Sequence, residues 1–97
     1  MLVGALAFEL HLPDVHSLKE KRAVVRPIVD GARNRFAVSA AEVGHGDKWQ
    51  RTSLGFAVVS GTAAQVSDVL DSVERFVWSF PEVEVIEATR QWMEVDR

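Results

Sequence analysis

The sequence has no cysteine and no long apolar run, and both absences restrict what the protein can be. Without cysteine there are no disulfides, thiolate zinc sites, iron–sulfur clusters or thiol nucleophiles. The apolar run from Leu2 to Phe8 is too short to span a membrane, and it lacks the basic flank and cleavage site of a signal peptide. We therefore expect a cytoplasmic protein that is stabilised by side-chain packing.

Motifs for common catalytic chemistry are also missing. The segment 12–17 has no glycines of the kind that build a phosphate-binding loop, and the neighbours His16 and Ser17 are not placed to act as base and nucleophile. His45 and Asp47 match no specific metal-ligand spacing. We expect no enzyme activity, no metal, no cofactor and no small-molecule substrate.

The composition is that of an ordinary globular protein, with 47% hydrophobic and 26% charged residues. A chain of 97 residues can bury one hydrophobic core but not two. No internal repeat or low-complexity tract interrupts it. We therefore predict a single domain over 1–97.

Hydrophobic periodicity predicts six secondary-structure elements. They are a strand over 2–12, a helix over 18–34, strands over 36–43 and 52–60, a helix between Thr62 and Pro81, and a strand over 83–95. Each helix is preceded by a capping-box pattern, Ser17 with Glu20 and Thr62 with Gln65. We expect Pro27 to kink the first helix without ending it.

The order strand, helix, strand, strand, helix, strand predicts an α+β fold, the ferredoxin-like βαββαβ sandwich. Right-handed crossovers give a four-stranded antiparallel sheet of order 4-1-3-2 with both helices on one face. Glu87 and Thr89 interrupt the alternation of the last strand, so its register stays open. The residues expected to face the helices are Leu6, Phe8, Leu10, Phe36, Val38, Leu54, Phe56 and Val58.

The opposite face of this sheet is expected to be open, small and mostly apolar. It has no aromatic side chains, so bases cannot stack on it as they do on RNA-binding sheets of this topology. Such a face favours an isologous dimer, although scattered surface alanines and valines also occur without any interface. Its residues are Val3, Ala5, Ala7, Ser39, Ala41, Gly55, Ala57 and Val59.

Charge is unevenly distributed along a chain of net charge −3. Basic residues concentrate between 19 and 35, whereas the C-terminal strand is acidic. The cations on the first helix suit phosphate contacts, or they form a solvated face that balances the acidic strand. Lys21 points into the apolar arc, where it must snorkel or find a carboxylate. The basic residues of this region are Lys19, Lys21, Arg22, Arg26, Arg33 and Arg35.

The loop Gly44–Arg51 joins the second and third predicted strands and carries Asp47, Trp49 and Arg51 between flexible glycines. We interpret Trp49 as a lid over the sheet edge or as a contact for a partner. Glu42, just before the loop, is able to pair with Lys21 or with Arg51.

Two stretches of the sequence form a recognisable combination: Ser-Leu-Lys-Glu-Lys-Arg at 17–22, and Phe-Ala-Val-Ser-Ala-Ala-Glu-Val-Gly at 36–44 followed by Asp47 and Trp-Gln-Arg at 49–51. In this combination the sequence resembles the YlxP-like family of small bacterial proteins of unknown function. The resemblance implies a ferredoxin-like fold and, in many bacteria, a gene among those for transcription elongation, translation initiation and ribosome maturation. It implies no established activity. The family positions are Ser17, Lys19, Lys21, Arg22, Ser39, Glu42, Asp47 and Trp49.

Two functions are therefore expected. The first is a non-enzymatic accessory factor that contacts RNA or the ribosome through the basic first helix and the Gly44–Arg51 loop. The second is a homodimeric interaction module that uses the open sheet face. The binding residues expected for the first function are Lys19, Lys21, Arg22, Arg26, Arg33, Glu42, Asp47, Trp49 and Arg51.

Overall fold

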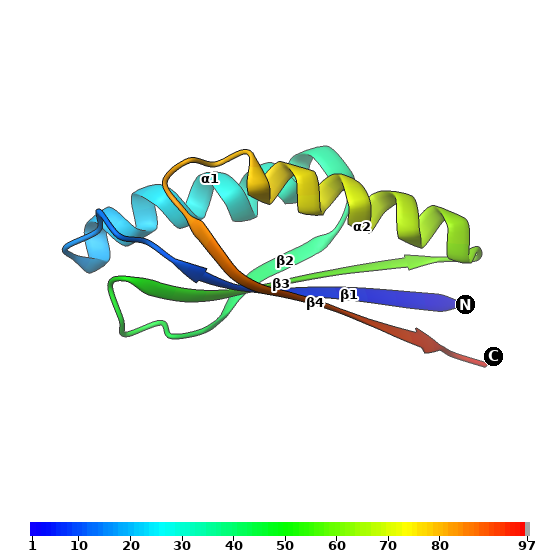
Figure 1. The fold of residues 1–97 in the computed structure, drawn as a ribbon. Helices are drawn as coiled ribbons and strands as arrows, with labels where there is room; N and C mark the ends of the chain where they lie inside the picture. Colours follow the sequence, from blue (N-terminus) through cyan, green and yellow to red (C-terminus); the bar gives the residue numbers. More distant parts are fainter. Residues whose placement is uncertain (97) are drawn as a thin grey trace.

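Both helices cover one face of a four-stranded antiparallel sheet, as Figure 1 shows in the computed structural model, which describes residues 1–96. The strand order is β2-β3-β1-β4, so the predicted fold and topology are confirmed. The elements are β1 (Leu2–His11), α1 (Leu18–Phe36), β2 (Ser39–Gly44), β3 (Arg51–Ser60), α2 (Ala63–Trp78) and β4 (Glu84–Glu94).

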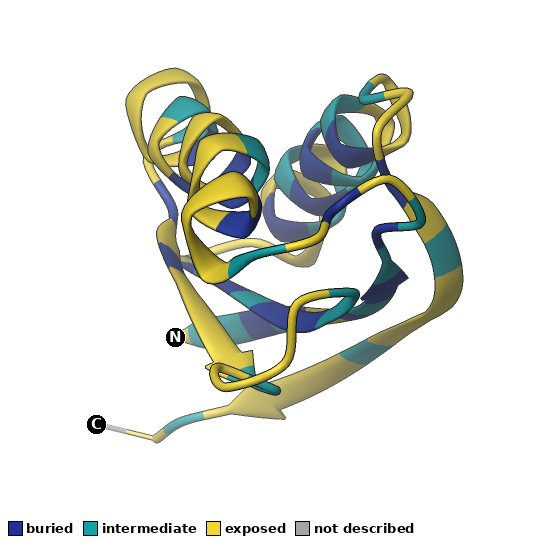
Figure 2. Cartoon of the chain, turned by 90° about the vertical axis from the view of Figure 1, so that its left-hand side faces the viewer, coloured by how far each residue is buried: buried dark blue, intermediate teal, exposed yellow. Residues whose placement is uncertain are grey.

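Alternation along the strands separates the core from the open face. Leu6, Phe8 and Leu10 of β1 are buried beneath the helices, and the rings of Phe8 and Phe56 meet edge to face with centroids 6.0 Å apart. Such a pair contributes about 0.5–1.5 kcal/mol beyond the area it buries. Figure 2 shows the buried residues between helices and sheet and the exposed residues on the outer turns of the helices.

Side chains cap both helices as predicted, with one difference in detail. The Ser17 hydroxyl accepts a hydrogen bond from the Glu20 backbone N–H at 3.1 Å, and the Thr62 hydroxyl accepts one from Gln65 at 3.3 Å. In the first cap the Glu20 carboxylate accepts from the Ser17 hydroxyl at 3.2 Å, which ties the two side chains together. The helix α1 continues through Pro27 to Phe36.

Phe36 was predicted to begin a strand, and this is wrong. It is the last residue of α1, and Ala37 follows in the left-handed conformation with φ of 51°. The reason is tertiary packing, because the Phe36 ring meets the Phe76 ring of α2 edge to face at 5.5 Å. The strand β2 therefore begins at Ser39.

A close approach of α2 to β1 depends on Gly4. A Cβ at this position would lie 2.3 Å from the Cγ1 atom of Val66 and 3.0 Å from Leu70 Cδ1. A bulge interrupts the pairing of β1 with β4. The register of the two strands shifts between Glu9 and Leu10, which leaves Ile86 of β4 as the extra residue. This shift explains why the alternation of the last strand did not fix its register.

Candidate functional site

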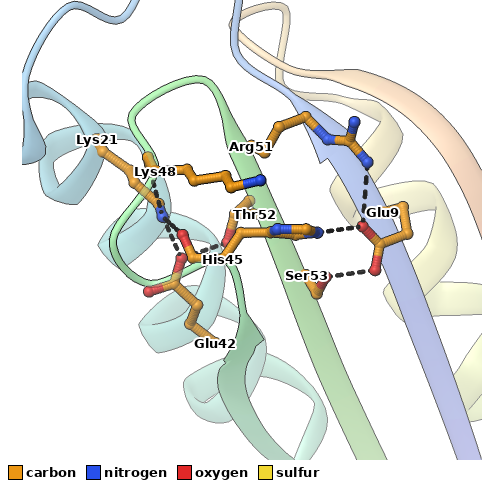
Figure 3. Close-up of polar contacts among 8 residues, drawn as sticks. All are labelled: Glu9, Lys21, Glu42, His45, Lys48, Arg51, Thr52 and Ser53. Atoms are coloured by element: carbon orange, nitrogen blue, oxygen red, sulfur yellow. Dashed lines mark hydrogen bonds and ion pairs between the residues drawn. The ribbon is translucent and has the colours of Figure 1, made fainter.

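Among residues 1–96, Lys21 is the most deeply buried charged residue, with 3% of its surface exposed. Its ammonium group lies 2.8 Å from Glu42 Oε2 and donates to the backbone carbonyls of His45 at 2.5 Å and Lys48 at 2.8 Å (Figure 3). An ammonium has three N–H donors, and the Lys21 ammonium is surrounded by two carbonyls and one carboxylate. Of the two partners predicted for Glu42, Lys21 is therefore the one observed.

This contact fastens the β2–β3 loop to the first turn of α1. The Ser17 cap starts the helix at a position that turns Lys21 toward the sheet. Glu42 lies opposite Leu54 on the helix-covered side of the sheet, and its carboxylate also accepts from the Thr52 hydroxyl at 2.5 Å. The motif residues Lys21 and Glu42 thus have a structural role.

A second polar cluster lies at the end of the open sheet face and is centred on Glu9 (Figure 3). Its carboxylate accepts a short hydrogen bond from the Ser53 hydroxyl, and it lies 3.3 Å from His45 Nε2 and 3.5 Å from Arg51 Nη2. The Ser53 hydrogen bond is the largest cause of a lowered pKa of Glu9, to which His45 and Arg51 add against partial desolvation.

His45 joins the two clusters, because its carbonyl binds Lys21 while its ring binds Glu9. It adopts a positive φ of 60°, which is uncommon for a residue other than glycine. Sequence reasoning missed Glu9 and Ser53. The one available signal was Glu9 itself, a charge that follows Ala5 and Ala7 on an otherwise apolar row of the strand.

The far end of the loop is anchored by Gln50. The side-chain amide of Gln50 donates to the backbone carbonyls of Pro13 at 3.2 Å and Val15 at 3.1 Å. The backbone carbonyl of Gln50 accepts from the Leu12 backbone N–H at 2.9 Å. Between these anchors and the Lys21 contact lies Trp49, whose surface remains 52% exposed. The loop is therefore held on both sides of an exposed indole.

The basic residues of α1 differ in whether they make contacts within the protein. Arg33 donates to the Ala40 carbonyl at 2.6 Å and pairs with Asp30 at 3.3 Å. Lys19, Arg22 and Arg26 are exposed and make no ion pair within 4.0 Å with any residue of 1–96. The acidic strand β4 lies at the sheet edge opposite β2, so it does not balance these three cations.

A groove of about 410 Å³ runs between α1 and β2. Its lining combines apolar side chains with Arg22, Arg26 and Arg33 and with the carboxylates of Asp30 and Glu42, and the groove reaches the loop at Gly46. The structure therefore brings the basic row and the loop, which are far apart in sequence, to one side of the molecule.

Other predicted positions lie outside these contacts. Ser39 begins β2 on the open face opposite Ala57, and Asp47 is exposed in the loop without an ion pair among the described residues. Arg51 is drawn toward Glu9 and is not free. Within residues 1–96, no three His, Asp or Glu side chains form a potential metal site, and no helix is long and apolar enough to cross a membrane.

The open face has the composition expected from the sequence. Ala5, Ala7, Gly55 and Ala57 line a shallow hollow of about 380 Å³. Val43 also lines this hollow, and Val59 and Met93 lie on the same face with 60% and 56% of their surfaces exposed. On the β4 side the face is polar, because Thr89 and Gln91 lie next to Ala7 and Ala5.

Comparison with known proteins gives a family but no activity. Residues 3–90 match the family described as "Protein of unknown function (DUF503)". The sequence is 42% identical over 91 residues to "Uncharacterized protein YlxP" of Bacillus subtilis (strain 168). The aligned region covers 94% of this chain and 99% of that protein.

Proposed function

Because the chain belongs to the DUF503 family, to which the sequence resemblance already pointed, we propose a function from its geometry: a non-enzymatic accessory factor that contacts RNA, alone or in the ribosome. The observation that supports it is the Lys21 contact, which holds the Trp49 loop against the end of α1 where Lys19, Arg22 and Arg26 are unpaired. Unpaired cations beside an exposed aromatic side chain suit a phosphate backbone with accessible bases.

Within residues 1–96, the three cations make no ion pair that would give them a structural use. They are exposed, so they contribute little to stability, and no carboxylate of the described residues neutralises them. Their side chains border two grooves, one beside β2 and one on the outer surface of α1 lined by Lys19, Ala23 and Pro27. A polyanion that follows α1 would contact all three.

Co-sedimentation with ribosomes and binding to ribosomal RNA at low salt test this proposal. We expect the triple variant Lys19→Glu, Arg22→Glu, Arg26→Glu to lose roughly tenfold or more in affinity. Arg22→Glu alone should weaken binding measurably, whereas Arg75→Glu, on an exposed face of α2, should not. Equal binding by Arg22→Glu and Arg75→Glu, or no binding by the wild type at low salt, would contradict the proposal.

A homodimer formed through the open sheet face is a second candidate, compatible with the first. Its support is the shape of that face, because the exposed Val59 and Met93 of one copy are able to enter the hollow of a second. An isologous contact needs hollow and projections on the same patch, and this face has both. Sedimentation equilibrium at high micromolar concentration tests it: a monomer would exclude the dimer, and Ala57→Arg should dissociate one.

A further inference from the structure

We propose that Trp49 is a preformed stacking platform for an unpaired base, so that the RNA bound by this protein is single-stranded at the β2–β3 loop. This inference rests on the proposed function and specifies its ligand. It starts from a contrast within the loop, where the backbone on both sides of Trp49 is fixed while the indole is 52% exposed.

Side chains from two other parts of the chain fix that backbone. On one side, buried Lys21 holds the Lys48 carbonyl at 2.8 Å, and the Lys48 N–H donates to the His45 carbonyl at 3.1 Å. On the other side, the Gln50 amide holds the carbonyls of Pro13 and Val15. The backbone around Trp49 therefore loses little conformational entropy when a ligand binds.

The fixed loop does not bury Trp49. An indole left half exposed gives up much of the free energy that its burial would provide. The open face of the sheet offers no alternative platform, because it presents Ala5, Ala7, Gly55 and Ala57. Trp49 directly follows Lys48, whose carbonyl is held by Lys21 in the first turn of α1, the helix that carries the unpaired cations.

The electrostatic surroundings favour a nucleic acid over an apolar protein surface. Lys48 precedes Trp49, and Lys21 connects this loop to the helical turn that carries Lys19 and Arg22. Phosphates on the cations and a base on the indole form the usual combination for single-stranded recognition. A duplex keeps its bases stacked inside, so it would contact only the cations.

The test compares Trp49→Ala with Trp49→Phe, using an unpaired oligoadenylate strand and a duplex RNA of equal length. Trp49→Ala should weaken binding of the single strand by about five- to hundredfold, and Trp49→Phe by no more than about threefold, because stacking on one aromatic side chain contributes in that range. Duplex binding should change little with either variant. Trp78→Ala is the matched control, since Trp78 is 60% exposed on α2.

Fluorescence gives a readout that a structural role would not change. In a Trp78→Phe, Trp92→Phe background, Trp49 is the only indole, and stacking should quench its emission as oligoadenylate saturates the protein. Thermal unfolding of Trp49→Ala verifies that the variant is folded.

Each result separates the two proposals. RNA binding that depends on Arg22 but not on Trp49 would overturn the stacking platform and leave the proposed function standing. Absence of RNA binding by the wild type would remove both. If Trp49→Ala weakens ribosome association but free RNA neither quenches Trp49 nor distinguishes the variants, the indole contacts a protein and the stacking platform is wrong.

Discussion

The groove between α1 and β2 and the groove between α2 and β4 are of similar size, about 410 and 390 Å³, and arginines line both. In the second groove Arg90 donates to Asp71 at 2.7 Å and to Glu74 at 3.2 Å. Partial burial lowers the pKa of Arg90, but these two carboxylates outweigh it and leave the pKa raised. In the first groove Arg22 and Arg26 have no such partner among residues 1–96.

The difference shows that the two halves of a repeated strand–helix–strand plan use their charges differently. Arg90 and the two carboxylates connect an edge strand to the helix above it, which is a structural use. In the first half that use falls to Lys21 and Arg33, whereas Lys19, Arg22 and Arg26 make no ion pair with any of residues 1–96. The second groove also has one arginine without a carboxylate partner among these residues, Arg75, but the first half carries three such cations on one helix.

The largest expected effect comes from the fixed cation of the first groove. Lys21→Met would leave two backbone carbonyls without this donor and Glu42 with the Thr52 hydroxyl alone. Because Lys21 is buried while the Glu42 side chain is 30% exposed, we expect a loss of about 2–4 kcal/mol. Urea denaturation measures the loss. Lys19→Met, two residues away and exposed, should change the free energy of unfolding by less than about 0.5 kcal/mol. A loss below about 1 kcal/mol for Lys21→Met would show that its partners are satisfied without it.

A smaller loss is expected at the second groove. Arg90→Met should destabilise the protein by about 1–2 kcal/mol, less than a buried pair because Asp71 and Glu74 remain partly solvated. Arg26→Met in the first groove should cost less than about 0.5 kcal/mol in the same urea titration. Equal losses for the two variants would remove the distinction between the grooves.

The salt dependence of RNA affinity tests whether the unpaired arginines of the first groove contact phosphates. If Arg22 and Arg26 contact phosphates of single-stranded RNA, replacing each with Gln should lower the slope of log affinity against log salt by about 0.7. Arg75→Gln should leave that slope unchanged. Fluorescence anisotropy between about 50 and 200 mM salt gives these slopes, and a wild-type slope near zero would contradict a phosphate contact.

The smallest effect is expected at Glu9, whose pKa is lowered in the folded protein from the usual value of 4.5. A lowered pKa stabilises the fold when the carboxylate is ionised, so the contribution is present above about pH 4.5 and is lost as the pH falls further through the folded pKa. Glu9→Gln should thus flatten the fall in thermal stability at acid pH. Glu82→Gln, on an exposed residue, is the control, and parallel curves for Glu9→Gln and wild type would refute the assignment.

The periodicity of the sequence was sufficient for the topology. Leu6, Phe8 and Leu10 mark the buried side of β1, and the helix caps at Ser17 and Thr62 mark where each helix begins. The error at Phe36 arose because alternation continues across the end of α1, and only the Phe76 ring on a distant helix decides between helix and strand.

The candidate site was predicted in part. Lys21 and Glu42 were identifiable, since a lysine in an apolar arc requires a partner. Gln50 and the contact of Glu9 with His45 were not, because they depend on the path of the loop, which the left-handed His45 and the bulge near Val43 determine. The contact of Glu9 with Ser53 follows instead from the register of β1 with β3. No sequence pattern records the direction in which such a loop turns.

The strand order gives the protein an electric dipole. β2 and β4 are the two outer strands, α1 lies against β2, and Glu84, Glu87 and Glu94 are exposed on β4. A chain of net charge −3 is weakly repelled by a distant polyanion, yet the field of that polyanion turns the cationic edge toward itself and the acidic edge away. If the polyanion is RNA, this field orients the protein before contact, so that the edge carrying α1 and the Trp49 loop faces the RNA.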